Sequence, residues 1–72
     1  PEKILEVNVP DEIVEVLGDD LTAVVEILGF DPRPSYQDDP ERVYGLSFSG
    51  YNIRFKVSGK TLYVVEITKI EI

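Results

Sequence analysis

The hydrophobic residues recur with different periods in different parts of the chain. Residues 3–9 alternate between apolar and polar side chains, which is typical of a half-buried β-strand. Between residues 11 and 28 the apolar side chains are three or four positions apart, which is the spacing of one helix face. Gly18 interrupts this second segment and Gly29 ends it, so the pattern predicts two short helices rather than one.

The last thirty residues predict an antiparallel meander of three strands. Ser49 and Gly50 suit a two-residue turn, and such a turn places Leu46 opposite Ile53. This register puts the large apolar side chains of the first two strands on one face of the sheet, which supports it. The polar side chains of the second strand then share the opposite face: Asn52, Arg54 and Lys56.

The second turn of the meander, near residues 58–60, leaves two registers open. A three-residue loop would direct Tyr63 and the odd-numbered side chains after it into the core. Glu66 would then lie across from Asn52 and diagonal to Arg54. A two-residue loop would exchange the two faces of the final strand.

This order of elements predicts an α+β fold with an N-terminal strand, two short helices and a three-stranded antiparallel meander. We expect a single domain over residues 1–72, in which the proline-rich, acidic segment 30–42 is a loop. Packing both helices on one face of a mostly antiparallel sheet buries both apolar surfaces. A chain of this length is near the lower limit at which a hydrophobic core alone stabilises a domain.

The composition limits the chemistry that is open to the chain. It has no cysteine and no histidine, which excludes disulfides, thiolate metal sites and the commonest general base. Catalysis would have to use Arg, Lys, Tyr or carboxylate groups, and we predict neither a metal site nor a cofactor. The apolar runs are too short to cross a membrane, so we expect a cytoplasmic protein. Methionine and tryptophan are also absent, which suggests a designed or heavily edited sequence.

Charge is distributed unevenly along the chain. The net charge of −7 argues against nucleic-acid binding by the domain as a whole, because phosphates require a positive surface. Residues 1–41 carry twelve acids and two cations, whereas residues 42–72 carry five cations and two acids. A domain with this asymmetry can still present a locally basic face.

Three stretches of the sequence resemble the RelE/ParE toxins of bacterial toxin–antitoxin systems. They are DPRP (31–34), ERVYGLSFSGYNIRFKV (41–57) and LYVVEITKI (62–70). The resemblance implies a basic, concave sheet that cuts mRNA on the ribosome or, in the ParE branch, poisons DNA gyrase. The nuclease branch works with Arg, Lys and Tyr, so the lack of histidine is compatible with it.

The resemblance implies three candidate catalytic cations: Arg54, Lys56 and Lys69. Asn52, however, occupies the position at which the family often has arginine. We therefore expect a non-catalytic version of the fold, designed or degenerate, that acts as a stable scaffold or protein-interaction module. The alternative is a ribosome-dependent mRNA endonuclease. A simpler interpretation of the sheet cations is a solvated face on which Arg54 pairs with Glu66.

The final strand is apolar on both sides, which would invite pairing with another chain if it formed an edge of the sheet. One of its sides carries the candidate partner-binding residues Leu62, Val64, Ile70 and Ile72. We expect a homodimer there, or an added antitoxin strand. RNA and the ribosome are partners only under the endonuclease alternative, and no membrane contact is expected.

Overall fold

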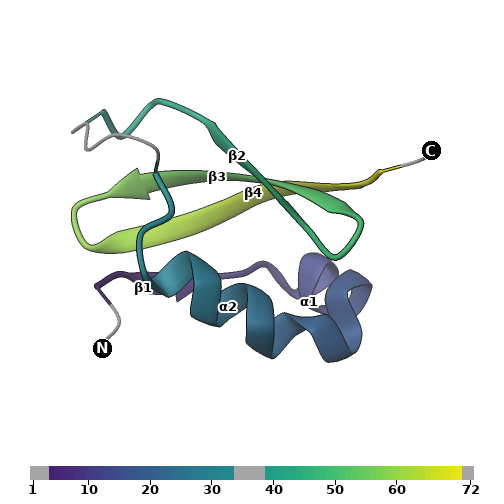
Figure 1. Ribbon diagram of the computed structural model, residues 1–72. Coiled ribbons are helices and arrows are strands. Elements are labelled where there is room, and N and C mark those ends of the chain that lie inside the picture. Colours follow the sequence, from purple (N-terminus) through teal and green to yellow (C-terminus); the bar gives the residue numbers. More distant parts are fainter. Residues whose placement is uncertain (1–3, 34–38, 71–72) are drawn as a thin grey trace.

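Two helices pack on one face of a four-stranded sheet in the computed structural model, which describes residues 4–33 and 39–70 (Figure 1). The elements in chain order are β1 (Glu6–Asn8), α1 (Asp11–Leu17), the 3₁₀ turn η1 (Gly18–Asp20), α2 (Leu21–Gly29), β2 (Tyr44–Phe48), β3 (Tyr51–Ser58) and β4 (Thr61–Lys69). The predicted α+β class and the order of strand, two helices and meander are confirmed. Within the described part of the chain, no helix is long and apolar enough to span a lipid bilayer.

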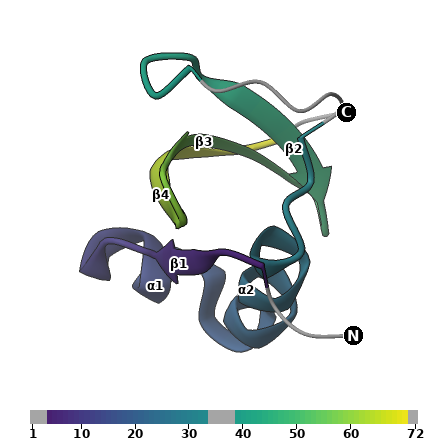
Figure 2. The same ribbon diagram turned by 90° about the vertical axis from the view of Figure 1, so that its left-hand side faces the viewer.

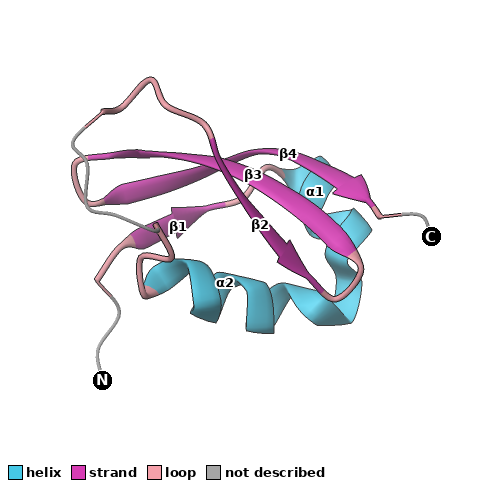
Figure 3. Ribbon diagram, turned by 45° about the horizontal axis from the view of Figure 1, so that its top comes forward, coloured by secondary structure: helices cyan, strands magenta, loops and turns pink. Residues whose placement is uncertain are grey.

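The strands are arranged in the order β1-β4-β3-β2 (Figure 3). The short strand β1 pairs in parallel with the start of β4, where Glu6 lies opposite Thr61 and Asn8 opposite Tyr63. Sequence periodicity did not predict this pairing. It makes β4 an internal strand over its first three residues, so the final strand can form an edge of the sheet only beyond Tyr63.

The turn between β2 and β3 is the one that the sequence predicts. Leu46 lies opposite Ile53. Ser49 and Gly50 both have positive φ angles, 52° and 80°, as a type I′ turn requires. This turn follows the right-handed twist of the two strands, so it fixes which side chains of β3 face the helices.

The turn between β3 and β4 has two residues, Gly59 and Lys60, because Ser58 pairs directly with Thr61. Leu62 and Val64 therefore enter the core, with exposed fractions of 0% and 2%. The odd-numbered side chains just after the turn, Tyr63 and Val65, are exposed instead. The three-residue loop is thus wrong for this half of the strand, and the two-residue alternative is correct.

A β-bulge then reverses the alternation in the second half of β4. Phe55 pairs with Val64 while Arg54 pairs with Glu66, which leaves Val65 as the additional residue. As a result Ile67, opposite Ile53, packs against the core again. Glu66 lies directly across from Arg54, two residue pairs along the ladder from the predicted position beside Asn52.

The hydrophobic core lies between the helices and the inner face of the sheet. Val24 and Leu28, one turn apart on α2, are fully buried, and so is Ile53 on β3. Among the described residues, the buried hydrophobic side chains are Leu5, Ile13, Leu17, Val24, Leu28, Tyr44, Ile53, Phe55, Val57, Leu62 and Val64. At the end of the sheet the Tyr51 hydroxyl donates a hydrogen bond of 3.4 Å to the Val16 carbonyl on α1.

Candidate functional site

The face of the sheet turned away from the helices is the candidate functional surface. Both helices lie on one side of the strands, and no described helix covers the other side (Figure 2). We call this second side the open face. Strand register places eight residues on it: Gly45, Ser47, Asn52, Arg54, Lys56, Tyr63, Glu66 and Thr68.

The open face carries two cations on β3, Arg54 and Lys56, which alternate with the buried residues Phe55 and Val57. These two positions are about 6.8 Å apart along the strand, at roughly 3.4 Å per residue. Lys56 lies opposite Tyr63, whose side chain is 43% exposed. An ammonium group, a guanidinium group and a phenol ring thus share one surface.

Arg54 forms a weak ion pair across the strands. Its Nε lies 3.6 Å from Oε1 of Glu66, and the two side chains are 54% and 61% exposed. This is the contact that the simpler interpretation of the sequence expected. A solvent-exposed pair of this kind contributes about 0–1 kcal/mol, and it leaves more than half of the guanidinium side chain accessible.

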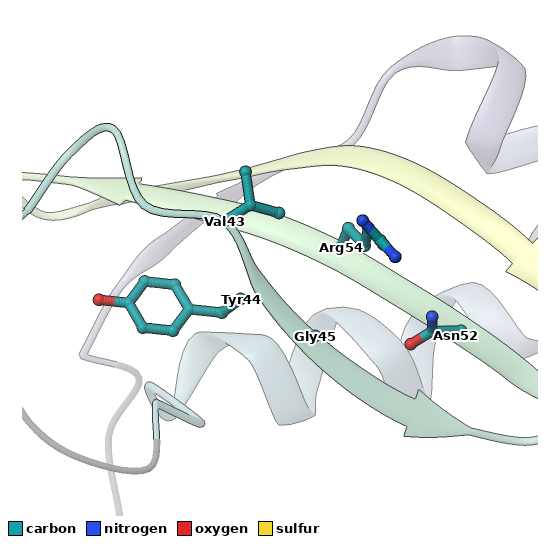
Figure 4. Close-up of a pocket in the computed structure, with 5 residues that line it drawn as sticks. All are labelled: Val43, Tyr44, Gly45, Asn52 and Arg54. Atoms are coloured by element: carbon teal, nitrogen blue, oxygen red, sulfur yellow. The ribbon is translucent and has the colours of Figure 1, made fainter.

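A shallow pocket of about 310 Å³ opens on this face between β2 and β3 (Figure 4). It is lined by Val43, Tyr44, Gly45, Asn52 and Arg54. Gly45 is directly opposite Arg54 in the strand pairing, so no side chain rises from β2 at that point. The side chains that β3 contributes to the pocket are the amide of Asn52 and the guanidinium group of Arg54.

Tyr44 lies at one end of the pocket, and its side chain is buried in the core. Its ring stacks on Phe55 with centroids 5.5 Å apart and planes inclined by 22°. The guanidinium carbon of Arg42 lies 5.4 Å from the centroid of the Tyr44 ring, a cation–π arrangement. The Tyr44 hydroxyl is buried without a hydrogen-bond partner of good geometry. The nearby guanidinium of Arg33 still interacts with it electrostatically.

An almost buried ion pair holds the chain as it leaves α2. Arg33 donates from Nε to Oδ1 and from Nη2 to Oδ2 of Asp31, both at 2.6 Å. The side chains of Arg33 and Asp31 are only 7% and 15% exposed. The hydrogen bonds from Arg33 lower the pKa of Asp31, and the same bonds raise the pKa of Arg33. Both groups therefore stay charged, and the start of the connection to β2 is fixed beside Tyr44.

The structure separates the three candidate catalytic cations. Arg54 and Lys56 lie together on the open face, whereas Lys69 lies opposite Tyr51 at the far end of β4. Of the candidate partner-binding residues, Leu62 and Val64 belong to the core, Ile70 is 45% exposed, and Ile72 lies outside the described residues. A partner strand on β4 stays a prediction, now limited to the part of its edge beyond β1.

Sequence reasoning missed the pocket and the Asp31–Arg33 pair. Gly45 gave no signal, because an isolated glycine in a strand usually marks only a bulge or a weak position. Asp31 and Arg33 are two positions apart on either side of Pro32, and opposite charges in so short a turn could have suggested a contact.

A comparison with protein families decides which family this arrangement represents. The profile of the TrmO C-terminal domain matches residues 4–70, nearly the whole chain. The chain belongs to the TrmO C-terminal domain family. No curated protein and no solved structure matches it with significant similarity.

Membership of the TrmO C-terminal domain family corrects the assignment to the RelE/ParE toxins. The toxin and toxin-like scaffold functions, the antitoxin partner and the designed or degenerate origin are withdrawn with it. The resemblance rested on three stretches (31–34, 41–57 and 62–70) and on the order of the elements. None of these features is specific, because alternating strands joined by a tight turn occur in many antiparallel sheets. In this chain the parts of those segments that lie in β2, β3 and β4 form the open face, with its pocket between β2 and β3.

Proposed function

We propose that this chain is an RNA-binding domain that serves tRNA modification and contacts RNA through its open face. The association of the TrmO C-terminal domain family with tRNA methyltransferases supports the role in tRNA modification. The separation of charge between the two layers of the fold supports the choice of the open face, and it is the observation that carries the proposal.

The helical layer is acidic and the meander is basic. Residues 10–30, which include α1 and α2, contain six acids and no lysine or arginine. Residues 44–70, which form the meander, contain four cations and a single acid, Glu66. A polyanion that approaches the domain is repelled by the helices and attracted to the sheet, whatever the net charge. The charge of −7 thus orients RNA toward the open face rather than excluding it.

The open face also carries the side chains that single-stranded RNA requires. Arg54 and Lys56 can neutralise phosphates, and the exposed ring of Tyr63 can stack on a base. If two phosphates are contacted in a single-stranded region, the logarithm of the affinity should fall with the logarithm of the salt concentration with a slope of about −1.4. The affinity should then decrease roughly sevenfold between 50 and 200 mM salt.

The test is a titration of the ¹⁵N-labelled protein with unmodified tRNA at low salt. We expect shifts of amide signals from β3 and β4 and little change in those of α1 and α2. The double variant Arg54→Gln with Lys56→Gln should lose at least about tenfold in affinity, together with most of its salt dependence.

The matched control is Lys60→Gln with Lys69→Gln, which removes the same charge from the turn after β3 and the end of β4. We expect its affinity to stay within about threefold of the wild-type value. Equal losses in the two double variants would mean that only total charge matters, and the proposed face would be wrong. Signals that shift mainly on the helices would have the same meaning.

A further inference from the structure

The floor of the pocket between β2 and β3 is a glycine that the structure of the sheet does not require. Gly45 occupies an edge strand without a positive φ angle, so the backbone does not require glycine there. A Cβ atom at this position would meet only Oδ1 of Asn52, at the ordinary contact distance of 3.6 Å. The floor is therefore open although a larger side chain would fit.

The two polar walls of the pocket offer different chemistry. Asn52 presents a carbonyl oxygen and an amino group side by side, the pairing that matches the edge of a nucleobase. Arg54 uses Nε toward Glu66, so its terminal amino groups are the ones oriented for an incoming anion. Figure 4 shows the Asn52 and Arg54 side chains rising from β3 on the same side of the sheet.

We infer that this pocket binds one unpaired nucleotide of RNA, with its base against Asn52 over Gly45 and its phosphate on Arg54. The inference rests on the proposed RNA-binding function and adds the position and the chemical class of the bound group. An unpaired base is required because the Watson–Crick edges of bases in a duplex are already occupied by base pairing.

The decisive variant is Gly45→Val. Valine fills the floor of the pocket, and it also suits a β-strand better than glycine does. We therefore expect a melting temperature equal to or above that of the wild type, together with at least tenfold weaker binding of tRNA and of 5′-AMP or 5′-UMP. Thr22→Val is the control, because Thr22 is an exposed residue of α2 on the helical side, away from the open face and its pocket. It should leave binding unchanged.

A second arm separates the base from the phosphate. The wild-type protein should bind 5′-AMP and 5′-UMP at least tenfold more tightly than ribose 5-phosphate, with shifts of the Gly45 and Asn52 amide signals. Asn52→Ala should remove this difference and leave the weak binding of ribose 5-phosphate intact. Equal affinity for ribose 5-phosphate and the nucleotides would reduce the site to a phosphate contact and overturn the inference.

The failure of this inference can be distinguished from a failure of the proposed function. If tRNA still binds the open face of Gly45→Val with wild-type affinity, the nucleotide site is wrong and the RNA-binding function stands. If tRNA does not bind the wild-type protein, both are wrong. Binding of a protein partner to the open face in place of tRNA would also overturn both.

Discussion

The ion pair between Asp31 and Arg33 gives the sharpest stability prediction. Asp31 has a φ angle of 61°, in the left-handed region that asparagine tolerates as readily as aspartate. Asp31→Asn therefore keeps the backbone conformation and the size of the side chain, and it removes the negative charge. It also places an amino group where one carboxylate oxygen accepted a hydrogen bond from Arg33.

The size of the effect follows from the contacts that change. A hydrogen bond to a charged group contributes about 1.5–3 kcal/mol, and at least one of the two 2.6 Å bonds is lost. We expect Asp31→Asn to lower the free energy of unfolding by about 2 kcal/mol, or the melting temperature by roughly 8–16 °C. A domain of this length has only about 4–11 kcal/mol in total, so urea denaturation will resolve the change.

The pH dependence provides the stricter assay. Because the pKa of Asp31 is lowered below its ordinary value of 3.8 in the folded protein, the pair stabilises the fold fully above that pH. This stabilisation is lost as the pH falls through the folded-state pKa. The difference in unfolding free energy between wild type and Asp31→Asn should therefore be constant from pH 7 to 5 and shrink toward pH 2. A difference that does not change with pH would refute the electrostatic explanation.

Two further variants measure how much the positive φ angle of residue 31 contributes to the free energy of unfolding. Asp31→Ala removes the ion pair and also forces a side chain with no local hydrogen bond into the left-handed region, at about 1–2 kcal/mol. Asp31→Gly removes the pair without that strain, at an entropic cost of about 0.5–1 kcal/mol. We expect the alanine variant to be less stable than the glycine variant by up to about 1.5 kcal/mol. The opposite order would mean that the positive φ angle is not maintained.

Three other substitutions test the sheet. Ser49→Asn should raise the free energy of unfolding by about 0.5–1 kcal/mol in urea, because Asn-Gly is the preferred type I′ turn; no gain would contradict the turn type. Leu62→Ala should cost about 2–5 kcal/mol, since its side chain is fully buried, whereas an outward-facing Leu62 would lose little. Glu66→Ala should cost less than about 1 kcal/mol and become neutral in high salt; a large, salt-independent loss would disprove a surface pair.

The meander was predictable because local turn chemistry determines its first register. Ser49-Gly50 favours a single two-residue hairpin. The register of that hairpin, with the alternation along the strand, places Ile53 and Arg54 on opposite faces of the sheet. Gly18, with a φ angle of 53°, likewise ends α1 where the sequence predicts a break between the helices. In these places the conformation depends on residues that are close in the sequence.

The second half of β4 was harder to predict, because its bulge is needed only to satisfy the core. The apolar positions change from even to odd numbers between Val64 and Ile67, and one extra residue in the strand is the way to bury both. Both registers of the turn were compatible with an alternating pattern read without that change. The change of the apolar residues from even-numbered to odd-numbered positions was the signal that could have decided between the two registers.

The candidate functional surface was predictable only in part. Alternation on β3 placed Arg54 and Lys56 on the face opposite the core, and the structure agrees. The pocket beside them depends on the pairing of Gly45 with Arg54. A single glycine in a strand does not indicate a pocket in the sequence. The TrmO C-terminal domain family was not predicted from the sequence, because strands with alternating apolar and polar residues occur in many unrelated sheets.

The parallel pairing of β1 with β4 also determines the order in which the domain can fold. It joins residue 6 to residue 61, whereas both hairpins of the meander close through two-residue turns. Closing so large a loop carries an entropic cost that the hairpins do not have, so the meander should form first and the N-terminal segment should dock last. Substitutions in β1 should accordingly accelerate unfolding and leave the refolding rate almost unchanged.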